Sequence, residues 1–175
     1  MGCAEGYYAV GLAKLFPEVQ VFGFDIDPLS RRQTRKLAKL NGVFQNLTIS
    51  GRCDHKVISS LVANHNGPIL MICDIEGAEI DLLNPLNCGS LHKIDILVEI
   101  HDMPGDNRIA KAMAGCFSQN HTIEIVKYSN RENWVNQNLS DPVFGGASRE
   151  WLLRMTDEYR VSGQTWLWMI CNKKC

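Results

Sequence analysis

Residues 69–79 read Ile-Leu-Met-Ile-Cys-Asp-Ile-Glu-Gly-Ala-Glu. The five apolar residues at the start of this stretch are typical of a β-strand that is buried on both faces, as strands of parallel sheets are. Asp74 follows that strand directly, and a short helix is predicted from Ala78 to Leu83. A buried strand that ends in a carboxylate and passes at once into a helix indicates an α/β fold, in which ligands bind at the carboxyl ends of the strands.

Strands and helices alternate on both sides of this stretch. Further strands are predicted over 19–24, 47–50, 94–100, 122–126 and 165–171, and further helices over 7–16, 29–40, 54–61, 108–117 and 148–158. This alternation predicts right-handed βαβ units, and therefore a Rossmann-like, mostly parallel sheet with helices on both faces. The polar segment 129–146 is expected to be a long loop, either functional or poorly ordered. We expect residues 1–175 to form one domain, in which 129–160 is an insertion on the substrate side.

Composition excludes several classes of protein. The 175 residues are 45% hydrophobic, enough for a sizeable core, and the net charge of -1 argues against a nucleic-acid binder. No apolar run reaches the roughly 20 residues of a membrane span, and no signal peptide is recognised. The seven scattered cysteines are therefore expected to be reduced thiols in the cytoplasm. The pattern specifies no oligomeric state.

The first candidate for ligand binding is the loop Gly2-Cys3-Ala4-Glu5-Gly6, which precedes a predicted helix. Its glycines permit a tight turn, Ala4 allows close approach of the backbone, and the amides that open the helix favour a polar or anionic group. On its own, such a motif is more often two loop glycines before a helix.

Asp25 strengthens the case for a nucleotide site. It follows Gly6 by 25 − 6 = 19 residues and ends the next predicted strand, which is the place of a carboxylate that accepts both hydroxyls of a ribose. Ile26 is then expected to lie against an adenine. Asp27 directly precedes Pro28, so we assign it to the cap of the following helix.

Carboxylates follow two further strands. Asp54 is suited equally to an adenine amino group and to a helix cap. Asp74 and Glu76 end the most apolar strand, where carboxylates are costly unless they are paired, solvated or facing a ligand. Glu79 is explained by the positive end of the helix that it begins.

Glu99 and His101 alternate with Ile100, so they lie on one face of their strand near its end. They suit a general base, His101, with Glu99 as its orienting carboxylate. A hydrogen-bonded structural histidine is the alternative. A divalent cation held by this histidine and the nearby carboxylates is the less favoured interpretation, and no metal is predicted.

Together, four motifs resemble a class I S-adenosylmethionine-dependent methyltransferase. They are Gly-Cys-Ala-Glu-Gly-Tyr-Tyr, Phe-Asp-Ile-Asp-Pro, Cys-Asp-Ile-Glu-Gly-Ala-Glu and Leu-Val-Glu-Ile-His, in that order within residues 2–101. The Asp-Ile-Glu-Gly-Ala-Glu segment is similar to that of the FkbM-type group. The resemblance implies the strand order 3-2-1-4-5-7-6, with the last strand, 165–171, antiparallel to the others.

The resemblance also implies roles for individual residues. Gly2, Ala4 and Gly6 would form the loop that holds S-adenosylmethionine, with Asp25 at its ribose, and Asp54 and Asp74 near its adenine and methionine portions. The implied reaction moves a methyl group to an oxygen or nitrogen of a small-molecule or sugar acceptor. His101 is the first choice of general base, and Glu76 the second.

The resemblance has one departure. The family has a strand directly before the glycine loop, and only Met1 precedes it here. We therefore expect an incomplete N-terminus that leaves two sheet edges without a partner and weakens cofactor binding.

Two other functions stay open. A nicotinamide-dependent oxidoreductase shares the glycine turn, although the spacing fits G-x-G-x-x-G less well, and a non-catalytic cofactor-binding protein would also carry this site.

Overall fold

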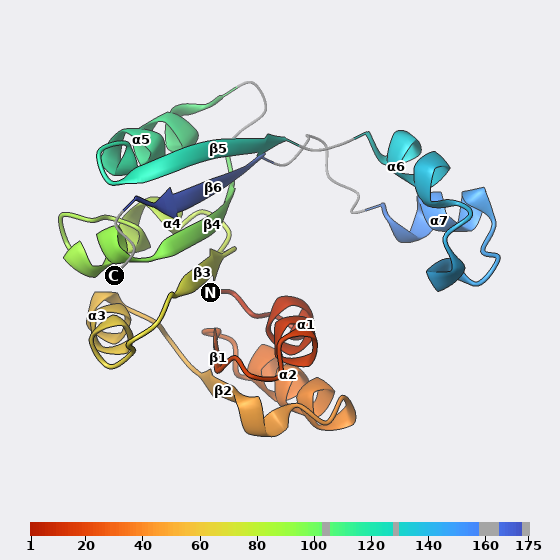
Figure 1. Ribbon diagram of the computed structural model, residues 1–175, viewed down its shortest axis with the longest axis horizontal. Coiled ribbons are helices and arrows are strands. Elements are labelled where there is room, and N and C mark those ends of the chain that lie inside the picture. Colours follow the sequence, from red (N-terminus) through yellow and green to blue (C-terminus); the bar gives the residue numbers. More distant parts are fainter. Residues whose placement is uncertain (103–105, 128–129, 158–164, 173–175) are drawn as a thin grey trace.

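A computed structural model describes residues 1–102, 106–127, 130–157 and 165–172. Helices and strands alternate along the chain (Figure 1), so the predicted α/β class is confirmed. The strands are β1 (Val21–Phe24), β2 (Leu47–Ser50), β3 (Leu70–Cys73), β4 (Asp95–Ile100), β5 (His121–Lys127) and β6 (Thr165–Cys171). The helices are α1 (Tyr7–Leu15), α2 (Pro28–Leu40), α3 (His55–Ala63), α4 (Glu79–Leu82), α5 (Arg108–Phe117), α6 (Arg131–Asn138) and α7 (Arg149–Met155).

The described strands form two sheets. β1 and β2 pair in parallel, and the second sheet has the order β3-β4-β6-β5. β3 and β4 are parallel, whereas β6 runs antiparallel to both of its neighbours, as expected for the last strand. Residues that follow β1, β2 and β3 line one cavity, so the carboxyl ends of these strands lie on the same side of the molecule.

Residues 1–3 join the two sheets. The Met1 ammonium donates to the carbonyl oxygen of Ile72 at 2.6 Å, and the Met1 carbonyl accepts from the amide of Asp74 at 3.2 Å. On the other side, the Cys3 amide donates to the carbonyl oxygen of Phe24 at 3.1 Å. One short segment thus bonds to the end of β3 and to the end of β1, which do not pair with each other. The expected incomplete N-terminus stays a prediction.

The expected incomplete N-terminus can be tested by extending the chain ahead of Met1. Four or five β-branched residues added ahead of Met1 are expected to raise the melting temperature by about 5 °C. The added residues would continue the segment that already bonds to both sheets. Each new hydrogen bond contributes about 0.5–1.5 kcal/mol, and two rows of bonds outweigh an ordering cost of about 1–2 kcal/mol per residue.

Thermal unfolding followed by circular dichroism measures this effect. The control is a Gly-Ser extension of the same length, which has low strand propensity. Equal melting temperatures for the two extended chains would show that no strand forms between β1 and β3.

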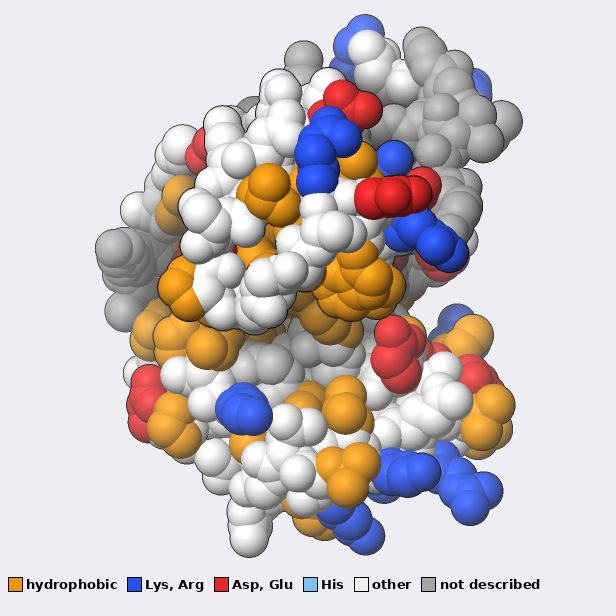
Figure 2. Space-filling model, turned by 90° about the vertical axis from the view of Figure 1, so that its right-hand side faces the viewer, with side chains coloured by type: hydrophobic (Ala, Val, Ile, Leu, Met, Phe, Trp, Pro, Cys, Tyr) orange, Lys and Arg blue, Asp and Glu red, His pale blue; other side chains and the backbone are white. Residues whose placement is uncertain are grey.

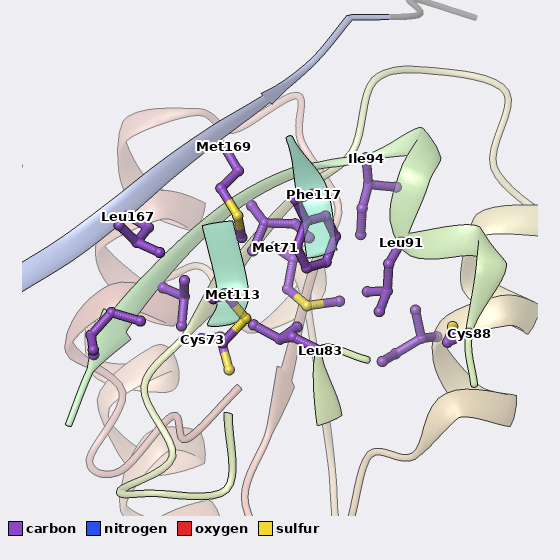
Figure 3. Packing of buried hydrophobic residues seen from close by; sticks show 14 residues of the cluster. Met71, Cys73, Leu83, Cys88, Leu91, Ile94, Met113, Phe117, Leu167 and Met169 are labelled. Carbon is purple, nitrogen blue, oxygen red and sulfur yellow. The ribbon is translucent and has the colours of Figure 1, made fainter. Parts of the chain in front are cut away.

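The main hydrophobic core belongs to the larger sheet (Figure 3). Met71 and Cys73 from β3 pack with Leu167 and Met169 from β6, and Phe117 from α5 is fully buried among them. A smaller cluster lies between α1, α2 and the β1-β2 sheet, with Val10, Ala38 and Leu47 at its centre. Helices pack against both sheets, but the expectation that β3 is buried on both faces is wrong: Met71 and Cys73 are buried, whereas Leu70 is 48% exposed.

The expectation of a loop over residues 129–146 is wrong for most of this segment. Residues 131–138 form α6, and Pro142–Phe144 form a 3₁₀ turn, while residue 129 lies outside the described chain. The side chain of Asn130 caps α6 by accepting from the amides of Glu132 and Asn133, a local signal that outweighs the polar composition. α6 packs against α7, and Figure 1 shows this helical pair away from the sheets. The helix expected over 148–158 is α7, and residue 158 is not among the described residues.

The surface carries a basic helix face. Figure 2 shows Lys and Arg side chains at the lower end of the molecule, the height at which Figure 1 places α2. Arg32, Lys36 and Lys39 of α2 are exposed.

Among the described residues, no helix combines the length and the apolar character that crossing a bilayer requires. Free thiols are found at five of the described cysteines, Cys3, Cys53, Cys73, Cys88 and Cys116.

Candidate functional site

A cavity of about 740 Å³ lies at the carboxyl ends of β1, β2 and β3. This volume is in the range of sites for cofactors and other small ligands. Its walls come from the N-terminal loop, from the segments that follow these three strands, and from α4. The lining residues are Met1, Gly2, Ala4, Phe24, Asp25, Ile26, Gly51, Arg52, Cys53, Asp54, His55, Asp74, Ile75, Glu76, Ala78, Asp81 and Leu82.

The glycine loop brings its backbone against the strand ends. Gly2 has φ 69°, and a Cβ atom at this position would lie 1.7 Å from the carbonyl oxygen of Asp74. Ala4 also adopts a left-handed conformation, with φ 42°. Gly6 has φ 104° and precedes α1, where a Cβ atom would lie 2.8 Å from Cγ2 of Thr34. The loop therefore presents main-chain atoms rather than side chains to the cavity.

The predicted loop residues divide into two groups. Gly2 and Ala4 line the cavity, whereas Cys3, Glu5 and Gly6 are not among its lining residues. Cys3 is buried with its Sγ 3.6 Å from Oγ1 of Thr34, and burial raises the pKa of its thiol. Glu5 is exposed. Cys3 and Gly6 thus shape the turn, and their contact with a cofactor stays a prediction.

Asp25 connects the loop to the strand end. One carboxylate oxygen accepts from the amide of Ala4 at 2.9 Å, and the other accepts from the amide of Asp27 at 2.9 Å. Each oxygen keeps a further lone pair that can accept from a ligand hydroxyl. Arg31 secures the same segment by donating to the carbonyl oxygens of Asp25 and Ile26 at 2.8 and 2.9 Å. Ile26 is 78% exposed on the cavity wall, so its side chain is open to a ligand.

Two aspartates cap helices at this edge. Asp27 accepts from the amides of Leu29 and Ser30, which confirms its predicted role at the start of α2. These bonds, that of Leu29 first, lower the pKa of Asp27.

Asp54 caps α3 through Oδ1, which accepts from the amides of Lys56 and Val57. The bond from Val57 is the main cause that lowers the pKa of Asp54. Asp54 also lines the cavity, so the cap is established and the adenine contact stays a prediction.

Four carboxylates surround His101 where β3 and β4 end. Nδ1 of His101 and Oε1 of Glu79 lie 2.5 Å apart, and the same oxygen accepts from the amide of Gly77 at 3.0 Å. Glu79 is completely buried. The expectation that Glu79 serves only the helix terminus is therefore wrong. The expectation that Glu99 orients His101 is also wrong, because Glu79 holds the ring. The single-turn helix α4 brings Glu79 back toward the end of β4.

The other imidazole nitrogen points toward three more carboxylates. Nε2 of His101 lies 3.2 Å from Oε2 of Glu76, 3.6 Å from Oδ1 of Asp74 and 4.0 Å from Oε1 of Glu99. Glu76 has φ 55°, a strained conformation for a residue with a side chain, and such strain gathers at functional sites. Since Nδ1 is engaged by Glu79, Nε2 is the atom at which His101 can take up or release a proton.

The cysteines near the cavity are poor nucleophiles. Burial raises the pKa of Cys53, on the cavity wall, to about 11 and that of Cys73 to about 12. At neutral pH both are thiols rather than thiolates, so the site does not present an activated sulfur. Its chemistry depends on oxygen and imidazole groups.

The fold is similar to several solved structures. A SAM-dependent methyltransferase from Thiobacillus denitrificans, in complex with S-adenosyl-L-homocysteine, matches at TM-score 0.51 and 14% identity, over 98% of this chain and 83% of that one. A candidate O-methyltransferase from Klebsiella pneumoniae matches at TM-score 0.55 and 14% identity, over 97% and 70%. The precorrin 8W decarboxylase from Methanobacterium thermoautotrophicum matches at TM-score 0.51 and 16% identity. The match covers 73% of this chain and only 64% of that protein's length.

No family model matches the sequence, and no curated protein matches it at a significant level. At identities this low, a shared fold does not carry over a substrate or a reaction. The arrangement of strands and helices in this chain is therefore the Rossmann-like fold that S-adenosylmethionine-dependent methyltransferases also have.

Proposed function

We propose that this chain is an S-adenosylmethionine-dependent methyltransferase that acts on an oxygen or nitrogen of a small-molecule or sugar acceptor, similar to the FkbM-type group. One observation carries the proposal: Gly2, Ala4, Asp25, Asp54 and Asp74 line one cavity at the carboxyl ends of β1, β2 and β3. In open α/β sheets this edge is where nucleotide cofactors bind.

The residues present fit the cofactor. Gly2 leaves its main chain open where a side chain would collide with Asp74, and Oδ1 of Asp74 is a buried oxygen without a hydrogen-bond partner in the described chain. Asp25 would hold the ribose hydroxyls, Ile26 and Asp54 the adenine, and Asp74 the amino-acid portion. When bound, S-adenosylmethionine supplies a methyl group on a positively charged sulfur, which needs no further activation.

The protein's own groups then position the acceptor and remove its proton. Alignment of two reactants in a site that excludes water contributes about 7–11 kcal/mol. His101 receives the acceptor's proton at Nε2, and Glu79 stabilises the imidazolium through Nδ1. Glu76, whose Oε2 lies 3.2 Å from the same nitrogen, is the second candidate base. Glu99 is buried with its Oε1 4.0 Å from Nε2, where its negative charge favours the imidazolium.

The fold helps to choose between the functions left open by the sequence. β6 runs antiparallel to both β4 and β5, whereas dinucleotide-binding Rossmann sheets are built from parallel strands. This topology favours the methyltransferase over the nicotinamide-dependent oxidoreductase. The free thiols suit a reducing compartment, and we propose the cytoplasm.

Isothermal titration calorimetry tests the choice of cofactor. We expect the purified chain to bind S-adenosylhomocysteine and to give no heat with NAD⁺ or NADP⁺. Tighter binding of a nicotinamide cofactor would reject the methyltransferase. The non-catalytic alternative requires a second measurement: S-adenosylhomocysteine release across a panel of sugar and small-molecule acceptors. Binding without any turnover would favour it.

A further inference from the structure

We propose that Asp74, Glu76 and His101 form a binding site for a divalent first-row metal cation. One ligand atom from each residue lies within 4.8 Å of the other two. Nε2 of His101 is 3.6 Å from the Asp74 carboxylate and 3.2 Å from the Glu76 carboxylate. Neighbouring ligands of an ion with bonds of about 2.1 Å are separated by roughly 3.0–3.5 Å. The two distances from Nε2 of His101 are already close to this spacing.

The hydrogen bonding of the cluster calls for a cation at its centre. Because Oε1 of Glu79 accepts a hydrogen bond from Nδ1, the neutral imidazole of His101 carries its proton on Nδ1 and presents a lone pair at Nε2. That lone pair faces Oδ1 of Asp74, which is also an acceptor. Both atoms are buried and lack a hydrogen-bond partner among the described residues. Two buried acceptors that face each other repel, and a metal ion between them satisfies both.

Glu79 supplies the support that such a ligand needs. Histidine ligands of metals usually donate their other ring nitrogen to a carboxylate, which orients the ring and raises its basicity. Glu79 makes this contact at 2.5 Å and is wholly buried, and its second oxygen, Oε2, has no hydrogen-bond partner in the described chain. Glu79 is thus a positioning residue for His101 rather than a ligand.

The donor set indicates which cations are suitable. One imidazole and two carboxylates suit Mn²⁺, Fe²⁺, Co²⁺ or Zn²⁺ better than Mg²⁺ or Ca²⁺, which prefer oxygen alone. Asp74 and Glu76 line the cavity, and the Glu76 side chain is 72% exposed, so an ion can enter. Three protein ligands leave positions for water or for an oxygen of a bound molecule. An ion bound at Nε2 of His101 and at Oδ1 of Asp74 would occupy the two atoms that the proposed function assigns to the general base and to the cofactor. The metal site is therefore an alternative use of these atoms and does not rest on the proposed function.

Binding of Mn²⁺ to the full chain, without a histidine tag and after treatment with EDTA, tests the proposal in the absence of cofactor. We expect the EPR signal of free Mn²⁺ to fall until one ion is bound per chain. Glu76→Gln and His101→Gln should each weaken binding by about 10-fold or more. Glu79→Gln should weaken it by about 10- to 100-fold, through the ring that it orients.

The controls separate this site from surface binding and from misfolding. His65→Gln and Glu124→Gln, at exposed positions, should bind Mn²⁺ as the parent does. Because the Glu76 side chain is exposed, Glu76→Gln tests the site even if the buried variants fail to fold. The proposal is overturned if the parent binds no Mn²⁺, or if Glu76→Gln and His101→Gln, both folded, bind it unchanged. Binding of S-adenosylhomocysteine in EDTA is measured separately, so loss of one function leaves the other readable.

Discussion

Gly2→Ala is expected to lower the free energy of unfolding by about 3 kcal/mol or more and the melting temperature by about 6–12 °C. The reason is steric: the new Cβ atom would lie 1.7 Å from the carbonyl oxygen of Asp74, which is backbone and has no other rotamer. The φ of 69° adds the cost of a left-handed conformation for a residue with a side chain. To relieve the overlap, the N-terminal loop must move away from β3.

Chemical denaturation and thermal melts measure this loss. Gly11→Ala is the matched control, because it makes the same change inside α1, where a Cβ atom would meet nothing within 4 Å. Alanine there should stabilise the helix slightly, by up to about 1 kcal/mol. If Gly2→Ala unfolds at the same temperature as the parent, the loop does not pack against the end of β3 as described.

Asp25→Asn is expected to weaken binding of S-adenosylhomocysteine by about 10- to 100-fold, the equivalent of about 1.4–2.8 kcal/mol. Both carboxylate oxygens accept from backbone amides, those of Ala4 and Asp27. In either orientation, an asparagine would turn its NH₂ group toward one of these N–H groups, and two donors would face each other. The loop and the ribose contact are both disturbed, while the volume of the side chain hardly changes.

Calorimetric titration of the two adjacent variants isolates the effect. Asp27→Asn is the control, because both oxygens of Asp27 also accept from backbone amides, so the variant creates the same donor conflict at a residue that is not among those lining the cavity. We expect Asp27→Asn to retain the parent's affinity. Equal affinities for Asp25→Asn and the parent would remove Asp25 from the cofactor site and would weaken the proposed function as a whole.

The local features of the fold were predictable from neighbouring residues. The apolar run that ends at Cys73 predicted a strand, and β3 ends at that residue, although burial alternates along it instead of covering both faces. Asp27 before Pro28 predicted the start of α2, because a cap depends on only three or four consecutive residues. The same principle would have found α6, since Asn130 followed by Glu132 is a cap signal that the polar composition of the segment concealed.

The candidate site was predictable only in part. Asp25 and Asp74 were identified because parallel strands place their carboxyl ends at one edge, so position in a strand translates directly into position in space. Glu79 was not identified as the partner of His101. The two residues are separated by 22 positions, and their contact depends on how α4 turns back over the end of β4.

By itself, the sequence determined the alternation of strands and helices, the cap of α2, and which carboxylates follow strands, because each depends on periodicity or on a few adjacent residues. Only the tertiary structure decided that β1 and β3 belong to separate sheets joined by residues 1–3, and that Glu79 rather than Glu99 holds His101. Such contacts are set by the packing of whole elements against one another, and a linear pattern does not encode the direction in which a buried side chain meets a distant partner.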